Sequence, residues 1–322
     1  MKHLAASTTA TGSLSQQRKL SGLGARLLSR RWLNDGMFLL PAFVLYTAVV
    51  IYPVLSSFVY GFTDWNGIDS TVNFVGLSNF AHLFSDPNVR VAFSNTLWFT
   101  ICAAIFQNAI ALGLALALDY LLSWARSLAV VMRVIFLIPM LLSPLAIGYL
   151  GQYIFSPTFG ALDVFLTDIH LTGLTRDWLG DPHVALGSLI VANLWQFVGY
   201  NMIIFLAGLQ SVPHDLLEAA SIDGAGAWRR FFNVTWPMIA PATTISLILT
   251  LIGGFKVFDL IFAMTNGGPG YATESVVLRV YREGFQNNHF GYAAAISSVL
   301  CLFIFLLSLM LLGVLRRREV VL

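Results

Sequence analysis

Six long apolar segments dominate the sequence and constrain its fold more than any other feature. A helix needs about 20 mostly apolar residues to cross the hydrocarbon core of a bilayer, and each segment is long enough to do so. Backbone polar groups in lipid must bond within their own segment, so uninterrupted apolar runs of this length favour helices. The predicted spans are Met37–Phe58, Thr96–Leu118, Val134–Ile154, Val184–Leu209, Thr243–Phe262 and Tyr292–Leu315.

The composition agrees with a membrane protein. Charged residues make up 11% of the 322 residues, and hydrophobic types make up 57%. An ordinary soluble domain has about 25% charged residues, so this chain cannot cover a water-soluble surface. A transmembrane β-barrel would show many alternating segments of about ten residues, which the sequence lacks. We therefore expect an all-α polytopic membrane protein, and the net charge of +2 is too small to indicate a nucleic-acid partner.

Basic residues orient the predicted bundle. Thirteen of the 18 Lys and Arg residues fall in the N-terminal segment, the second and fourth loops and the C-terminal end, whereas the first and third loops are acidic. By the positive-inside rule, both termini are cytoplasmic. The predicted organisation is a cytosolic tail (1–36), a transmembrane domain (37–315) and a cytosolic end (316–322). Within the tail, residues 25–33 (ARLLSRRWL) form either an amphipathic helix at the membrane surface or part of a solvated basic segment.

The fourth loop, residues 210–241, is the longest predicted cytoplasmic connection. Residues 215–222 are compatible with a short helix, and Gly224 and Gly226 follow it, as glycines commonly do at helix C-termini. A second helical turn is expected at residues 228–233. The loop is therefore predicted to form a helix–turn–helix outside the bilayer.

This loop resembles the coupling loop, known by its Glu-Ala-Ala (EAA) motif, of bacterial ATP-binding-cassette (ABC) importer permeases. The residues that match in order and spacing are Glu218, Ala219, Ala220, Gly224, Val234 and Pro237. Trp236 departs from the pattern, because family members usually have Leu there. In that family the first helix of the loop docks on a separate ATPase subunit. The resemblance implies that the docking contact is made by Glu218, Ala219, Ala220, Asp223 and Gly224.

Further segments resemble the larger permease subunit of maltose-type carbohydrate importers. They are Leu40–Asn66, Phe74–Phe84, Phe255–Ser275 and Phe290–Leu300. The resemblance implies the six-helix permease fold of a type I importer in the bacterial cytoplasmic (inner) membrane. It also implies a second permease subunit, two ATPase subunits that bind ATP and Mg²⁺, and an external solute-binding protein. The implied solute is a sugar, an oligosaccharide such as a maltodextrin, or a related polyol such as a glycerol phosphate.

The chain itself is expected to be non-catalytic. It contains no Gly-x-x-x-x-Gly-Lys-Ser/Thr loop, so ATP is expected to bind on the partner subunits. Six scattered histidines and two distant cysteines offer no metal-ligand spacing, so no metal or other cofactor is expected in this chain.

One face of the fourth predicted span carries polar and aromatic residues. Offsets of four, seven and eight positions make the following residues neighbours on a helix: Asn193, Phe197, Tyr200 and Asn201. Aromatic rings cover the C–H surfaces of sugars and amides bond their hydroxyls, so this face is a candidate solute path. Thr250 and Gly254 in the fifth span are further candidates by resemblance to the maltose-type subunit. The alternative for each residue is interhelical packing and hydrogen bonding.

Lys256 and Asp259 are the only charges well inside a predicted span. Their i,i+3 spacing allows them to pair on a helix, and an unpaired charge at the bilayer centre costs about 2.5–3.5 kcal/mol. A structural ion pair or an outer gate is the first interpretation of these residues, and direct solute contact is the second.

Two other functional classes compete with an ATP-driven importer. A secondary, ion-coupled transporter needs coupling charges at mid-membrane and usually has internal repeats. A membrane-embedded enzyme needs paired carboxylates, a histidine cluster or an activated nucleophile facing the interior. Neither set of features is clear in the sequence.

Overall fold

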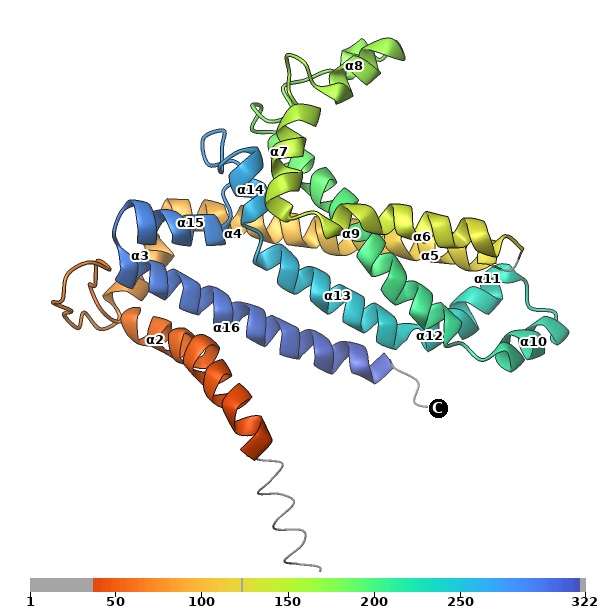
Figure 1. The fold of residues 1–322 in the computed structure, drawn as a ribbon, viewed down its shortest axis with the longest axis horizontal. Coiled ribbons are helices and arrows are strands. Elements are labelled where there is room, and N and C mark those ends of the chain that lie inside the picture. Colours follow the sequence, from red (N-terminus) through yellow and green to blue (C-terminus); the bar gives the residue numbers. More distant parts are fainter. Residues whose placement is uncertain (1–36, 123, 319–322) are drawn as a thin grey trace, which may run out of the picture. The chain divides into compact units, whose positions relative to one another are not determined.

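The computed structural model describes residues 37–122 and 124–318, shown in Figure 1. The predicted N-terminal tail, with its two interpretations, lies outside these residues, as do residues 319–322. The chain forms two compact units, residues 1–59 and 60–322. We describe each unit by itself.

The described part of the first unit is one apolar helix, which begins at Met37 and runs to Tyr60, one residue into the second unit. Its middle turn is a π-helix, η1 (Thr47–Ile51), and α2 (Tyr52–Tyr60) follows. Pro53 accounts for the irregularity, because it has no N–H and its ring crowds the carbonyl four residues earlier. At 24 residues the helix is long enough to cross a bilayer, in agreement with the first predicted span.

Three helical segments of the second unit are long and apolar enough to span a membrane: Pro87–Leu122, Ala185–Gln210 and Phe290–Leu315. The first consists of α4 (Pro87–Cys102), the π-helix η2 (Ala103–Gln107) and α5 (Asn108–Leu122). The other two are α9 and α16. They correspond to the second, fourth and sixth predicted spans.

The third predicted span is broken in two. The sequence predicts one helix interrupted by prolines over Val134–Ile154, but the structure has α6 (Arg126–Leu141) and α7 (Pro144–Ile154), bent by 96°. Ser143 precedes Pro144, and its backbone is extended (φ −64°, ψ 145°) because the proline ring disfavours the helical conformation in the residue before it. The Ser143 hydroxyl then caps α7 by accepting a hydrogen bond from the N–H of Ala146.

The fifth predicted span is shorter than expected at its C-terminal end. The helix α13 (Ala240–Phe255) ends at Phe255 rather than Phe262, and α14 (Asp259–Met264) begins a new direction. Two successive glycines, Gly253 and Gly254, precede the end of α13 and weaken the helix there. At its other end α13 is bent by 67° from the short helices within Ala227–Met238. If each bent pair is one span, the described residues contain six candidate spans, four of them unbroken.

Small residues allow the helices of the second unit to pack closely. Ala111 and Ala115 on α5 are completely buried in an apolar cluster that includes Met202 and Phe205 of α9. A side chain on Gly199 of α9 would overlap the carbonyl oxygen of Phe136 on α6. Close packing of small residues is the main way in which helices associate in lipid, where no hydrophobic effect drives them together.

Short helices lie at the ends of the spans. Figure 1 shows α3 (Ser78–Ser85) and α15 (Val276–Tyr281) at one end of the second unit. α8 (Ala161–Asp168) follows α7. The predicted helix–turn–helix is present at the opposite end from α3 and consists of α10 (His214–Ile222), α11 (Ala227–Arg230), the π-helix η4 (Phe231–Thr235) and α12 (Trp236–Met238).

Candidate functional site

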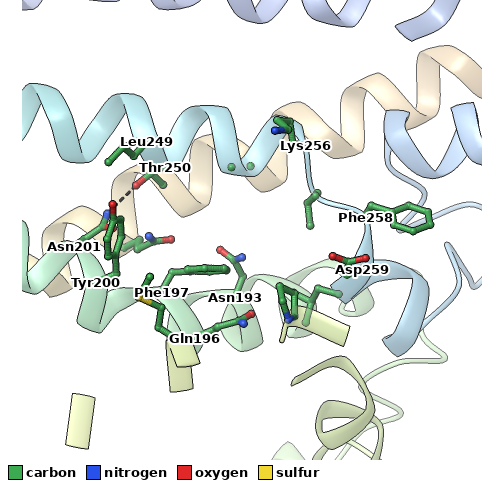
Figure 2. Close-up of a pocket in the computed structure, with 17 residues that line it drawn as sticks. Asn193, Gln196, Phe197, Tyr200, Asn201, Leu249, Thr250, Lys256, Phe258 and Asp259 are labelled. Carbon is green, nitrogen blue, oxygen red and sulfur yellow. Dashed lines mark hydrogen bonds between the residues drawn. The ribbon is translucent and has the colours of Figure 1, made fainter. Parts of the chain in front are cut away.

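A cavity of about 400 Å³ lies between the spans of the second unit. Its wall comes mainly from α9 and α13, with contributions from the breaks that follow α6 and α13. All six residues proposed for the solute path line it: Asn193, Phe197, Tyr200, Asn201, Thr250 and Gly254. Figure 2 shows the α9 side chains and Thr250 of α13 around this space. The structure thus brings these residues together, although it does not by itself assign them to solute binding.

Two of these residues are already engaged with each other. The amide of Asn201 donates a 2.7 Å hydrogen bond to the hydroxyl of Thr250, and both residues are buried. Nearby, the hydroxyl of Ser246 donates to the Asn108 carbonyl oxygen at 2.7 Å. Longer contacts of 3.4 and 3.5 Å join Asn108 to Thr250 and Asn201. This polar network joins α5, α9 and α13, so the packing interpretation applies to Asn201 and Thr250 at least in part.

The sequence analysis missed two glutamines in the wall, Gln107 and Gln196. Gln196 lies three residues after Asn193 on the face of α9 that the spacing had already identified, so the same periodicity could have found it. Gln107 is the last residue of the π-helix η2, and its polar side chain inside an apolar run was the available signal.

Lys256 and Asp259 also line the cavity, but they do not form the predicted ion pair. Among the described residues no salt bridge joins them. The physical reason is the break in the span, because i,i+3 pairing requires a continuous helix and α13 ends at Phe255. Lys256 instead follows the C-terminus of α13, and Asp259 begins α14. Each charge is at the helix end whose dipole favours it.

The end of α10 shows why the EAA segment contains a glycine. Gly224 has φ of +75°, a left-handed conformation that glycine adopts at little cost. The N–H of Ala225 donates to the Ala220 carbonyl at 2.9 Å, and the N–H of Gly224 donates to the Ser221 carbonyl at 3.1 Å. These two bonds form a Schellman motif, which terminates the helix and satisfies its last carbonyls.

The helix α10 is held on one side and exposed on the other. Leu217 packs against the apolar cluster of α5, α6 and α9, and the Arg230 guanidinium donates a 2.8 Å hydrogen bond to the Ser221 hydroxyl. Glu218 and Ala219 are exposed, and Ile222 is 86% exposed. The helix therefore has a fixed inner side and an outer side that is open to another protein.

At the opposite end of the unit, buried charges join α15 and η5 (Arg282–Gln286) to the start of α4. The Arg279 guanidinium lies 3.5 Å from Asp86 and 2.6 Å from Glu283. The Tyr292 hydroxyl donates to Asp86 at 2.9 Å, and the N–H of Asn88 donates at 2.8 Å. Burial opposes ionisation of Asp86, but the Asn88 and Tyr292 hydrogen bonds and the Arg279 charge together hold its pKa below the usual 3.8.

The loop after α14 is fastened to α4. The Asn95 amide donates to the carbonyls of Tyr271 and Glu274, at 2.9 and 3.2 Å. The Thr96 hydroxyl accepts a 3.0 Å hydrogen bond from the N–H of Val276. This segment is thus held against α4, and residues 273–276 are buried there. Within the described residues, no group of three or more His, Cys, Asp or Glu side chains could hold a metal ion.

Apolar spans, a cavity between them that is lined by amides and aromatic rings, and an exposed helix–turn–helix at one end are typical of a membrane permease. The chain belongs to the family described as binding-protein-dependent transport system inner membrane component, whose model matches residues 109–319. It is therefore an ABC-transporter permease of the inner membrane, and nothing in the comparisons favours an ion-coupled transporter.

Several relatives that match most of the chain are permeases. The chain is 34% identical over 286 residues to the probable starch degradation products transport system permease protein AmyD of Thermoanaerobacterium thermosulfurigenes, covering 88% of this chain and 94% of AmyD. It is 33% identical over 269 residues to the sn-glycerol-3-phosphate transport system permease protein UgpA of Pectobacterium atrosepticum, covering 83% and 89%.

A solved structure has the same fold. One chain of a bacterial ABC transporter involved in the import of the acidic polysaccharide alginate superposes with a TM-score of 0.77 at 23% identity. The superposition covers 90% of this chain and 96% of that chain. A second structure of an alginate transporter, in complex with an alginate pentasaccharide-bound periplasmic protein, superposes with a TM-score of 0.76.

Proposed function

We propose that this chain is one of two permease subunits of an ATP-driven importer for a sugar, an oligosaccharide or a related polyol such as a glycerol phosphate. The partner subunits are a second permease, two ATPase subunits that bind ATP and Mg²⁺, and an external solute-binding protein. Both termini and the α10–α12 segment face the cytoplasm. The cavity between α9 and α13 is this subunit's part of the solute path.

The substrate class is supported by the relatives and by the chemistry of the cavity. The name of AmyD refers to starch degradation products, and the name of UgpA refers to sn-glycerol 3-phosphate. Both kinds of solute carry hydroxyl groups, and the second also carries a phosphate ester. The cavity wall combines amides with the aromatic rings of Phe197 and Tyr200. Amides bond hydroxyls, and aromatic faces cover C–H surfaces, so this lining suits polyhydroxylated solutes.

The exposed side of α10 is the observation that carries the proposal. Three large apolar side chains of the loop are exposed, Ile222 (86%), Trp228 (75%) and Phe232 (54%), and several such side chains on one loop outside the bilayer favour a contact with another protein. The rings of Trp228 and Phe232 stack on each other, with centroids 5.4 Å apart. Glu218 and Ala219 lie within the same exposed part of the loop. We assign to this surface the contact with an ATPase subunit, which transmits ATP-driven motion to the spans.

Reconstitution of the assembled importer in liposomes tests the proposal. With ATP inside and the solute-binding protein outside, we expect uptake of at least one solute from a panel of maltose, maltotriose and sn-glycerol 3-phosphate. ATP hydrolysis should rise when the liganded binding protein is added. Uptake that follows a proton gradient and needs no ATP would contradict the proposal and support an ion-coupled transporter.

A further inference from the structure

The polar groups in the cavity wall fall into two sets that differ in their hydrogen bonding. Asn201 and Thr250 are bonded to each other. Asn193, Tyr200 and Gln107 make no side-chain hydrogen bond to another described residue, although all three line the cavity. Of these three residues, Gln107 is buried and Asn193 and Tyr200 are half-buried, and the polar groups of all three remain available to a partner that enters the cavity.

Gln107 shows the contrast with its neighbour most clearly. It is only 4% exposed and lines the cavity from the end of the π-helix η2. The next residue, Asn108, bonds to the Ala104 carbonyl at 2.7 Å and to the Ser246 hydroxyl at 2.7 Å. π-Helical turns are frequent at functional sites. At the end of η2, the Gln107 amide lines the cavity, whereas the amide of the next residue, Asn108, is hydrogen-bonded to Ser246 of α13.

Gln196 is held in one orientation by the broken third span. Its amide nitrogen donates a 3.1 Å hydrogen bond to the carbonyl of Leu142, the residue after α6. A carbonyl can only accept, so the nitrogen of Gln196 must face it and the amide oxygen must point elsewhere. That oxygen is buried without a hydrogen-bond partner among the described residues. It is therefore an acceptor that lacks a donor, on a side chain that is 1% exposed.

We infer that Gln107 and Gln196 bind hydroxyl groups of the solute, an inference that rests on the proposed function and deepens it. A hydroxyl can donate to the Gln196 oxygen, and it can both donate to and accept from the Gln107 amide. A carboxylate or phosphate monoester oxygen has no proton to give to Gln196 when ionised. The Gln196 oxygen therefore favours a hydroxyl over an ionised carboxylate or phosphate oxygen, whereas the Gln107 amide, which also donates, can bind either.

Substitutions at the adjacent positions Gln107 and Asn108 distinguish a loss of solute binding from a loss of helix packing. In the reconstituted importer, Gln107→Met removes the amide but keeps a flexible side chain of similar length, whereas Asn108→Leu removes a packing contact. With radiolabelled maltotriose and sn-glycerol 3-phosphate as probes, we expect Gln107→Met to lower the number of solute molecules taken up per ATP by about three- to tenfold. Its thermal midpoint should stay at the wild-type value. Asn108→Leu should lower the thermal midpoint.

The Gln107→Met/Gln196→Met double variant tests the second glutamine. If Gln196 also binds the solute, the double variant should take up fewer molecules per ATP than Gln107→Met alone. Unchanged uptake per ATP in Gln107→Met, or a loss of stability equal to that of Asn108→Leu, would overturn the assignment of Gln107. A double variant equal to Gln107→Met would overturn that of Gln196. Failure of the wild-type importer to use ATP for uptake would instead contradict the proposed function.

Discussion

The amide of Asn201 and the hydroxyl of Thr250 are 2.7 Å apart, and this hydrogen bond ties α9 to α13 in the wall of the cavity. Both residues are predicted by sequence as part of a solute path. The bond gives them a second role, because any solute contact by either group must compete with it. The two helices that supply most of the cavity wall are thus held together by polar side chains within the cavity.

Thr250→Val should destabilise the permease because it keeps the shape of the side chain and removes the hydrogen bond. Interhelical hydrogen bonds in membranes contribute about 0.6 kcal/mol on average and up to about 1.7 kcal/mol, so we expect a loss of about 1 kcal/mol. Unfolding of the purified protein by denaturing detergent measures this. Thr243→Val is the matched control, since Thr243 bonds only to the Ile239 carbonyl in its own segment. Equal losses in the two variants would show that the α9–α13 bond is unimportant.

Gly224→Ala should impair coupling while Gly226→Ala should not. Gly224 needs a positive φ of +75°, which costs a residue with a side chain about 1–2 kcal/mol. Gly226 has φ of −65° and open space around it, so alanine fits there without strain. ATP hydrolysis stimulated by the binding protein is the readout. A Gly226→Ala variant as defective as Gly224→Ala would mean that the end of α10 is not the critical feature.

Two harsher changes in the same loop should leave the protein inserted but uncoupled. Gly224→Pro cannot adopt the positive φ at all. Glu218→Lys reverses a charge on the exposed side of α10. Membrane fractionation should recover both variants at wild-type amounts, whereas uptake should be lost. Normal uptake in both variants would refute the assignment of the coupling loop.

Tyr200→Ala and Asn193→Ala should change uptake kinetics without changing membrane insertion. Both side chains line the cavity and have no side-chain hydrogen bond to another described residue, so their loss affects the solute more than the packing. Val191→Ala on the same helix is the control, because Val191 is 55% exposed and is not among the cavity-lining residues. Wild-type kinetics in both Tyr200→Ala and Asn193→Ala would remove this face of α9 from the solute path.

Gly199→Ala should destabilise the contact between α9 and α6. The added methyl group would overlap the Phe136 carbonyl, and overpacking of this kind costs about 1–3 kcal/mol. Gly187→Ala on the same helix is a matched control, since nothing lies within 4 Å of the added atom. Replacing this glycine should even favour the helix. The prediction fails if thermal unfolding ranks the two variants in the opposite order.

The buried charges around Asp86 should make stability depend on acid pH. The pKa of Asp86 is lowered in the folded protein, so its stabilisation is present above the usual value and is lost as pH falls through the lowered value. Arg279, Glu283, Tyr292 and, through Glu283, His289 belong to the same cluster. Asp86→Asn should flatten the fall of the thermal midpoint below about pH 4. An identical acid profile in wild type and variant would contradict this role.

The spans could be predicted because their lengths and apolar content follow from the bilayer itself. The solute-path residues on α9 could be predicted because a continuous helix has a fixed period. Two features of the spans could not. The first is the 96° break after Leu141, which depends on the extended backbone of Ser143. The second is the end of α13 at Phe255, because Lys256 and Asp259 then do not lie on one continuous helix and their i,i+3 spacing does not bring them together.

Gln107 shows a limit of a different kind. It is not in the span that carried the periodic signal, and its place in the cavity wall depends on a π-helical turn and on the packing of α5 against α9 and α13. The α-helical period that we used to find residues on one face does not apply across a π-helical turn. Gln196, in contrast, was within reach of the same spacing that identified Asn193 and Tyr200.

Cross-linking at α10 tests the central claim most directly. In a background without Cys102 and Cys301, Ala219→Cys places one thiol on the exposed side of the coupling helix. A short reagent with one thiol-reactive and one photoactivatable group, attached to this thiol in the assembled importer, should join this chain to an ATPase subunit on illumination, and the yield should change when ATP is added. A thiol that reacts only with impermeant reagents from the external side, or that never cross-links to the ATPase, would contradict the account.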